Sequence, residues 1–143
     1  MNDANRTLIA QTELDGLLRD FISPMQRATL HAGLRSEEAS HFSELILNLA
    51  ERIKTMPQTY DTDGQGENAI VHLHYFRGSF DAWVTEKDRG DASGDTSQYQ
   101  AYGFASFGGK REAEAGYIGI AEIINADVEL DLYWEPKPFK DVQ

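Results

Sequence analysis

Two histidines, His72 and His74, stand two residues apart in a segment rich in β-branched and aromatic residues. On a strand, alternate side chains project from the same face, so both imidazoles would face one side of a sheet. Two imidazoles are half of a zinc site, and Glu86 in the following segment could add a carboxylate. The alternative is a pair of metal-free histidines on a half-exposed sheet face.

Carboxylates suggest a second kind of chemistry, because a general acid and a general base need only two groups in one cleft. Candidates occur throughout the C-terminal half, at Asp81, Glu86, Glu122, Asp131 and Glu135. No nucleophile elbow, phosphate-binding glycine loop or zinc-protease helix motif accompanies them. A metal-dependent or carboxylate-based enzyme that uses the His72 and His74 face is therefore the alternative hypothesis, and no catalytic residue or cofactor is assigned.

Residues 61–67 alternate carboxylates ahead of a glycine, as the start of an EF-hand calcium loop does. The twelfth position from Asp61 is His72 rather than a bidentate Glu, and the segment leads into a predicted strand. These features favour a solvated turn over a calcium site.

A third pattern joins acidic residues to aromatic ones. Residues 88–97 form a loop with two Gly and three Asp, and aromatic residues flank the loop on both sides. An aromatic anchor inside a negative rim suits a basic protein partner. The candidate partner-binding residues are Trp83, Asp88, Asp91, Asp95, Tyr99 and Tyr102. The alternative is that the rings pack into the core and the acids only solvate a face.

Composition supports a basic partner. The 143 residues carry 13 Lys and Arg against 24 Asp and Glu, which gives a net charge of -11. Such a charge repels phosphate backbones and anionic lipids, so we expect neither direct nucleic-acid binding nor membrane binding. The chain has no Cys and no apolar run long enough to span a bilayer, which fits a cytoplasmic protein.

Residues 1–57 read as a helical N-terminal extension. Apolar residues recur at helical spacing over residues 13–22, where Thr12 is the predicted N-cap. Ser23 and Pro24 begin a second helix that runs to Gly33, and a third helix follows Ser36 and ends at Pro57. These helices could pack on the rest of the chain or pair between two copies as a homodimer.

The pattern of residues 58–143 predicts a sheet domain, which opens with a polar linker or turn over residues 58–68. The predicted strands cover residues 69–76, 80–87, 99–107, 117–118 and 128–134, with a small helix over 120–124. In the strand over 99–107, rings at Tyr102 and Phe104 alternate with small residues such as Gly103, which favours close approach on one face. The predicted class is therefore α+β: a mainly antiparallel sheet of four or five strands with a small C-terminal helix, preceded by two or three helices.

Four stretches carry a resemblance to a known family. They are residues 70–76 (IVHLHYF), 81–88 (DAWVTEKD), 116–123 (GYIGIAEI) and 129–138 (ELDLYWEPKP). With them, residues 69–142 resemble an uncharacterised small domain, a domain of unknown function found on plasmids, integrative elements and phages. The family has no established activity, so the resemblance implies a setting on mobile DNA and no catalytic residues.

The leading hypothesis is a non-catalytic, acidic protein-binding module of a mobile element. The resemblance implies the setting, and the charge suggests the partner. Host defence complexes such as restriction or CRISPR effectors expose Lys and Arg channels for nucleic acid, which a compact polyanion can occupy. We therefore expect an inhibitor of such a nucleic-acid-binding complex.

Overall fold

The structure, a computed structural model, describes residues 2–143. Its α-helices are α1 (Asp3–Asp15), α2 (Pro24–Leu34), α3 (Ala39–Thr55) and α4 (Ile120–Asn125). Its strands are β1 (Ile70–Val71), β2 (Leu73–Arg77), β3 (Phe80–Glu86), β4 (Ala101–Ser106), β5 (Glu114–Ile118), β6 (Glu129–Leu130) and β7 (Lys137–Pro138). Short 3-10 turns lie at Leu17–Asp20, Gly66–Asn68, Lys110–Glu112 and Phe139–Asp141. No helix in this range combines the length and the apolar character needed to cross a bilayer.

The first helix differs from its prediction over residues 13–22, which was wrong. It begins at the Asn2 cap, whose side chain accepts from the Asn5 N–H at 2.8 Å, and it ends at Gly16. The Thr12 hydroxyl bonds back to the Leu8 carbonyl inside the helix and does not cap it. The first turns of the helix are mostly polar, so the spacing of apolar residues does not reveal where the helix begins. Apolar residues continue at helical spacing past Gly16, but the helix ends there.

The second and third helices begin and end close to where their signals predict. The Ser23 side chain accepts from the Gln26 N–H at 3.1 Å, with Pro24 in the first helical position. In α3, Ile46, Leu49 and Ile53 form the buried stripe, and the helix ends two residues before Pro57.

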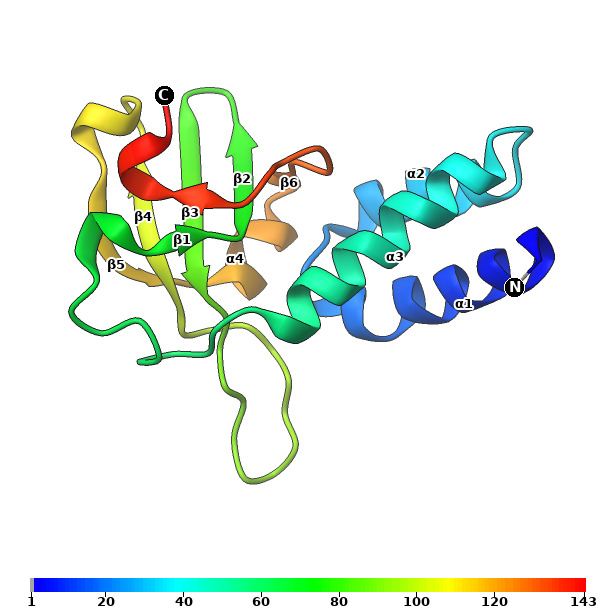
Figure 1. Cartoon of the computed structure of the whole chain (residues 1–143), viewed down its shortest axis with the longest axis horizontal. Helices are drawn as coiled ribbons and strands as arrows, with labels where there is room; N and C mark the ends of the chain where they lie inside the picture. The colour runs from blue at the N-terminus through cyan, green and yellow to red at the C-terminus, as the bar shows by residue number, and fades with distance from the viewer. Residues whose placement is uncertain (1) are drawn as a thin grey trace.

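The sheet is antiparallel throughout, in the order β5-β4-β3-β2-β6. The α+β class, the five-stranded antiparallel sheet and the preceding helices are therefore confirmed. Figure 1 shows the N-terminal helices extending from one side of the sheet. A second, two-stranded ribbon of β1 and β7 crosses the other face of the sheet.

Two predicted strands are wrong in extent. The strand over 69–76 is divided at His72, because β1 pairs with β7 whereas β2 joins the main sheet. The predicted strand over 128–134 pairs only at Glu129–Leu130, after which the chain turns and returns as β7. Because the chain turns after β6, β7 can pair with β1 and cover the face of the sheet opposite the helices.

The helices and the sheet share one buried cluster, which includes Leu14 and Ile53 from the helices and Leu73 and Tyr75 from β2. A smaller cluster of Val71, Trp83, Phe139 and Val142 fills the space under the β1–β7 ribbon. The sheet therefore carries an apolar layer on both faces, and Val71 does not share a face with Leu73.

The edge strand β6 is held to the helices by one side chain. The Gln26 amide donates to the Leu130 carbonyl at 2.7 Å and accepts from the Leu130 N–H at 2.9 Å. This side chain satisfies backbone groups that an open edge would leave unpaired. At the opposite edge, β5 pairs only with β4 among the described residues.

Candidate functional site

The end of β3 positions the aromatic residues at one end of the sheet. The Glu86 carboxylate is buried and accepts from the N–H groups of Tyr60 and Thr62, both at 2.8 Å, and from the Thr62 hydroxyl. Tyr60 has φ 78°, in a region that non-glycine residues rarely adopt. Because a buried carboxylate must be satisfied by donors, Glu86 holds this strained backbone in place.

Asp88 plays the same role for the acidic loop. Its carboxylate accepts from Gly90 N–H at 2.9 Å, from Tyr99 N–H at 3.1 Å and from Gln100 N–H at 2.9 Å. These bonds join the two ends of the loop that hangs below the sheet in Figure 1. The Asp88 oxygens are thus engaged with the backbone, and this residue shapes the proposed surface without being free to bind a partner.

Three tyrosines lie together near these segments; we call Tyr60, Tyr102 and Tyr117 the tyrosine surface. Tyr99 is exposed at the end of the acidic loop and, among the described residues, makes no ring contact with these three. The hydroxyls of Tyr60 and Tyr117 lie 2.8 Å apart, and the rings of Tyr102 and Tyr117 meet edge to face with centroids 5.8 Å apart. The segment before Tyr60 contacts the segment after Tyr99 through a 2.8 Å bond from the Thr59 hydroxyl to the Gln100 carbonyl. Tyr60, Tyr99 and Tyr117 are more than half exposed, whereas Tyr102 is half-buried.

One uncompensated carboxylate, Asp63, lies near these rings, and two more, Asp91 and Asp95, lie in the acidic loop. The pKa of Tyr117 is raised first by its hydrogen bond with Tyr60 and further by nearby groups that include the Asp63 charge. Asp91 accepts from the hydroxyl and N–H of Ser93 and from the N–H of Asp95, and these bonds lower the pKa of Asp91. Among residues 2–143, neither Asp63, Asp91 nor Asp95 forms an ion pair.

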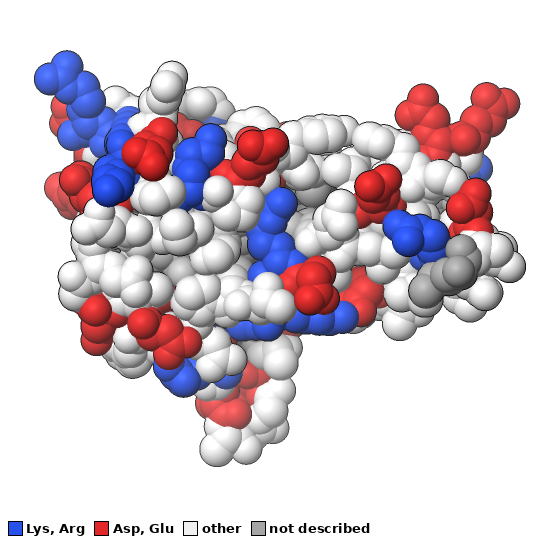
Figure 2. Space-filling model, in the orientation of Figure 1, with Lys and Arg blue, Asp and Glu red and all other residues white. Residues whose placement is uncertain are grey.

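On the face that Figure 2 draws, the acidic residues do not form one continuous patch. They lie over the sheet, over the helices and on the hanging loop, with Lys and Arg side chains among them. Asp61 is one of the compensated acids, since it accepts from the Gln58 N–H at 2.8 Å and pairs with Arg89 at 2.7 Å. These contacts lower the pKa of Asp61 and engage the first carboxylate of the calcium-like segment.

Trp83 is a correction to the predicted partner-binding set. The residue is 4% exposed and packs against Phe139 with ring centroids 5.4 Å apart, so it cannot serve as a surface anchor. The ribbon that covers it is formed by residues far along the chain, which the local pattern does not reveal. Conversely, Tyr60 and Tyr117 were not predicted as partner-binding residues, because only the fold brings them beside Tyr102.

The histidine set is not assembled as predicted. Among the described residues, no group of three His, Asp or Glu side chains is arranged to hold a metal ion. Glu86 is engaged with residues 60–62, and His72 lies at the break between β1 and β2. Burial lowers the pKa of His72, and the nearby Arg52 charge lowers it further.

His74 instead lies between two carboxylates. Its Nε2 is 2.8 Å from Asp81 Oδ1, and its Nδ1 is 3.5 Å from Asp131 Oδ2. The ring stacks on Trp83 with centroids 5.8 Å apart, and Nδ1 is buried without a hydrogen-bond partner among residues 2–143. The site borders a cavity of about 430 Å³ that is also lined by Lys110. This arrangement can hold or pass a proton. His74, Asp81 and Asp131 were each candidates from the sequence, but no motif or spacing predicted that they would meet.

Comparisons of this chain with protein-family models, with curated proteins and with solved structures found no match. The resemblance of residues 69–142 to a domain of mobile elements therefore stays a prediction.

Proposed function

We propose that the protein is a non-catalytic binding module whose tyrosine surface, with the acidic loop beside it, binds a basic protein. The observation that carries the proposal is the exposed Tyr60–Tyr117 pair, in which the backbone of Tyr60 is held by the buried Glu86 and the Asp63 charge lies near Tyr117. Tyrosine supplies large contact area with few rotatable bonds, and it is enriched in protein interfaces. Asp63 beside the rings and the carboxylates of the acidic loop would attract a cationic partner and exclude an anionic one.

The partner that we propose is a nucleic-acid-handling defence complex of the host, such as a restriction or CRISPR effector. Two arguments support this choice. A net charge of -11 matches the Lys and Arg channels that such complexes use for nucleic acid. The resemblance of residues 69–142 implies a mobile-element setting, in which inhibition of host defence is an advantage. If this is right, excess DNA displaces the protein from its partner.

Affinity capture from a lysate of the host tests the proposal. The immobilised wild type is compared with a Tyr60→Ser/Tyr117→Ser variant and with a matched control, Tyr133→Ser, whose ring is 69% exposed outside the tyrosine surface. Capture is repeated at about 0.05 M and about 0.5 M salt, since screening weakens exposed charge pairs. Basic nucleic-acid-handling proteins are expected on the wild type and the control at low salt, and not on the double variant. Capture that is equal on all three proteins contradicts the proposal.

A homodimer through the N-terminal helices is part of the same proposal. Leu8 and Ile9 on α1 are 63% and 40% exposed, although the opposite side of that helix packs inside the molecule. Exposed aliphatic residues on a helix are one way in which two copies associate. Light scattering of the wild type and of a Leu8→Ser/Ile9→Ser variant checks this part, and equal monomer masses would exclude it.

One observation favours a second candidate, a carboxylate-based enzyme. His74 with Asp81 on one nitrogen and Asp131 near the other is an arrangement suited to general acid–base catalysis. Turnover of chromogenic esters, phosphates or glycosides would support it if His74→Gln abolishes the activity and Tyr133→Ser retains it. Turnover that persists in His74→Gln, or none at all, counts against it.

A further inference from the structure

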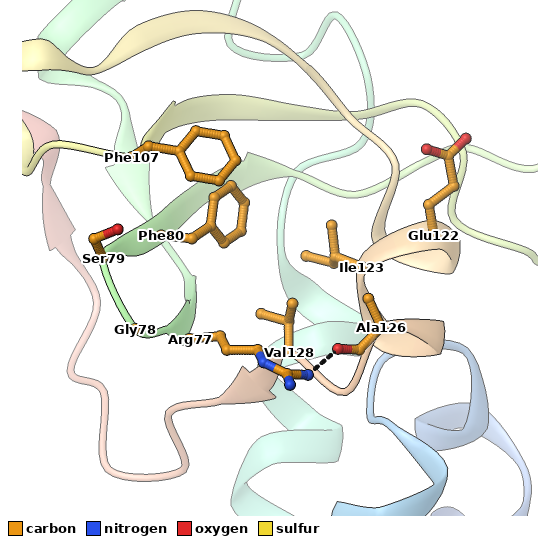
Figure 3. A pocket seen from close by; sticks show the side chains of 9 residues that line it. All are labelled: Arg77, Gly78, Ser79, Phe80, Phe107, Glu122, Ile123, Ala126 and Val128. Carbon is orange, nitrogen blue, oxygen red and sulfur yellow. Dashed lines mark hydrogen bonds between the residues drawn. The ribbon is translucent and has the colours of Figure 1, made fainter.

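An apolar groove lies at the opposite end of the sheet strands from the acidic loop. It has a volume of about 760 Å³ and runs between the β2–β3 turn, the end of β4 and α4. Figure 3 shows the rings of Phe80 and Phe107 on one side and Ile123 and Val128 on another. The two rings have centroids 5.0 Å apart, and Phe107 is 77% exposed. A volume of about 300–1,000 Å³ with apolar walls is typical of small-ligand sites.

Arg77 gives this groove a cationic end. Its Nη1 donates to the Ala126 carbonyl at the end of α4, which fixes the guanidinium beside Val128 (Figure 3). Among residues 2–143, Arg77 forms no ion pair with an acid. A guanidinium has five N–H donors, so the remaining donors are available to a ligand. Glu122 lies away from Arg77 across the groove in Figure 3.

We propose that this groove binds a small organic anion with an aromatic body and one carboxylate. The rings of Phe80 and Phe107 would stack on the aromatic body, and Arg77 would bind the carboxylate. Arg77 has no acidic partner among residues 2–143, and the acid that lines the groove, Glu122, lies across from it, so the carboxylate of the ligand would bind at the Arg77 end.

Naphthalene-2-carboxylate is the probe, and its uncharged amide, naphthalene-2-carboxamide, is the matched ligand. Each is titrated into isotope-labelled full-length protein while the backbone amide signals are recorded. We expect saturable shifts confined to the groove, at residues 77–80, 107 and 122–128, with a dissociation constant at or below about 1 mM for the carboxylate. The amide should bind about threefold to tenfold more weakly, because it lacks the charge that Arg77 recognises.

Four variants separate the contributions. Phe107→Ala should weaken the carboxylate about tenfold, since the exposed ring is removed without disturbing the core. Arg77→Gln should abolish the preference for the carboxylate over the amide, and Arg77→Lys should keep part of it. Tyr133→Ala removes a similarly exposed ring outside the groove and should change nothing.

Several results would overturn the proposal. They are shifts that do not saturate by about 10 mM, shifts outside the groove, equal binding of carboxylate and amide, or unchanged binding to Phe107→Ala. Light scattering that shows a dimer abolished by Phe107→Ala would assign the groove to a second copy instead. None of these results bears on the tyrosine surface, which is lined by other residues.

Discussion

The buried carboxylate of Glu86 accepts a 2.8 Å hydrogen bond from the backbone N–H of Tyr60, whose side chain is exposed. The two residues are 26 positions apart in the chain. Their hydrogen bond fixes the backbone of the polar turn that carries Tyr60, and so fixes the position of Tyr60 in the tyrosine surface. A single buried group thus links the stability of the sheet to the geometry of the proposed binding surface.

Glu86→Gln should destabilise the protein by about 3 kcal/mol, because the amide places an N–H group where one carboxylate oxygen accepts hydrogen bonds. Urea unfolding followed by tryptophan fluorescence measures this loss, since Trp83 is buried and reports on the fold. Glu67→Gln is the matched control: its side chain is exposed, and its free energy of unfolding should change by less than about 0.5 kcal/mol. Equal unfolding midpoints for the two variants would show that the hydrogen bonds from Tyr60 and Thr62 to Glu86 do not stabilise the fold.

Gly103 and Gly116 are register partners on β4 and β5, and they should respond oppositely to alanine. A Cβ at Gly103 would lie 2.0 Å from the Trp83 carbonyl oxygen, whereas a Cβ at Gly116 has no atom within 4 Å. Gly103→Ala should therefore cost about 2–3 kcal/mol or more, because a backbone strand must move. Gly116→Ala should be neutral or stabilise slightly by restricting the unfolded chain. Thermal unfolding of both variants checks the contrast, and similar melting temperatures would contradict it.

The strand around Gly103 is one of several features that nearby residues alone determine. Alternation of Tyr102 and Phe104 with small residues is a local signal, so the strand was predictable and is confirmed as β4. The close contact at Gly103 is with the backbone of the neighbouring strand β3 rather than with a group on the sheet face. The caps at Ser23 and Pro24 and the end of α3 before Pro57 are local in the same sense. Each of these features is decided within a few residues of chain.

The candidate sites depend on contacts between distant segments, and for that reason the sequence did not reveal them. Trp83 has the type and position of a surface anchor, yet the ribbon of β1 and β7 buries it. The sequence around Tyr60 predicts a solvated turn, whereas in the structure the Tyr60 N–H donates a hydrogen bond to Glu86 at the end of β3. The His74 site joins β2, β3 and the turn after β6, and no spacing rule relates Asp81 to Asp131.

Tyr117 should ionise above the ordinary tyrosine pKa of 10.0, mainly because its hydroxyl is hydrogen-bonded to Tyr60. Tyr60→Phe removes that bond and should move the pKa of Tyr117 back towards 10.0. Since the folded pKa is raised, the contribution of Tyr117 to stability is complete below pH 10.0 and is lost as pH rises above it. Carbon NMR of labelled tyrosine during a pH titration separates the six residues. An unchanged Tyr117 pKa in Tyr60→Phe would contradict the hydrogen-bonded pair.

His72 should make the protein lose stability on the acid side of neutrality. Its pKa lies below the ordinary 6.5, first because burial disfavours the imidazolium and then because of the Arg52 charge. As pH falls through 6.5 the unfolded chain therefore takes up this proton before the folded one does. The stability contributed by neutral His72 is thus complete above pH 6.5 and is lost as pH falls towards the folded pKa.

The comparison that isolates this effect is the wild type against His72→Gln, because the two proteins differ at that position alone. Free energies of unfolding measured from about pH 8 to about pH 5 should converge as pH falls, since only the wild type loses the His72 contribution. Arg52→Gln should raise the His72 pKa part of the way towards 6.5 and leave the remainder, which burial causes. Proton NMR of the imidazole measures both values. A His72 pKa at or above 6.5 in the wild type would mean that the ring is more hydrated than its half-buried position implies.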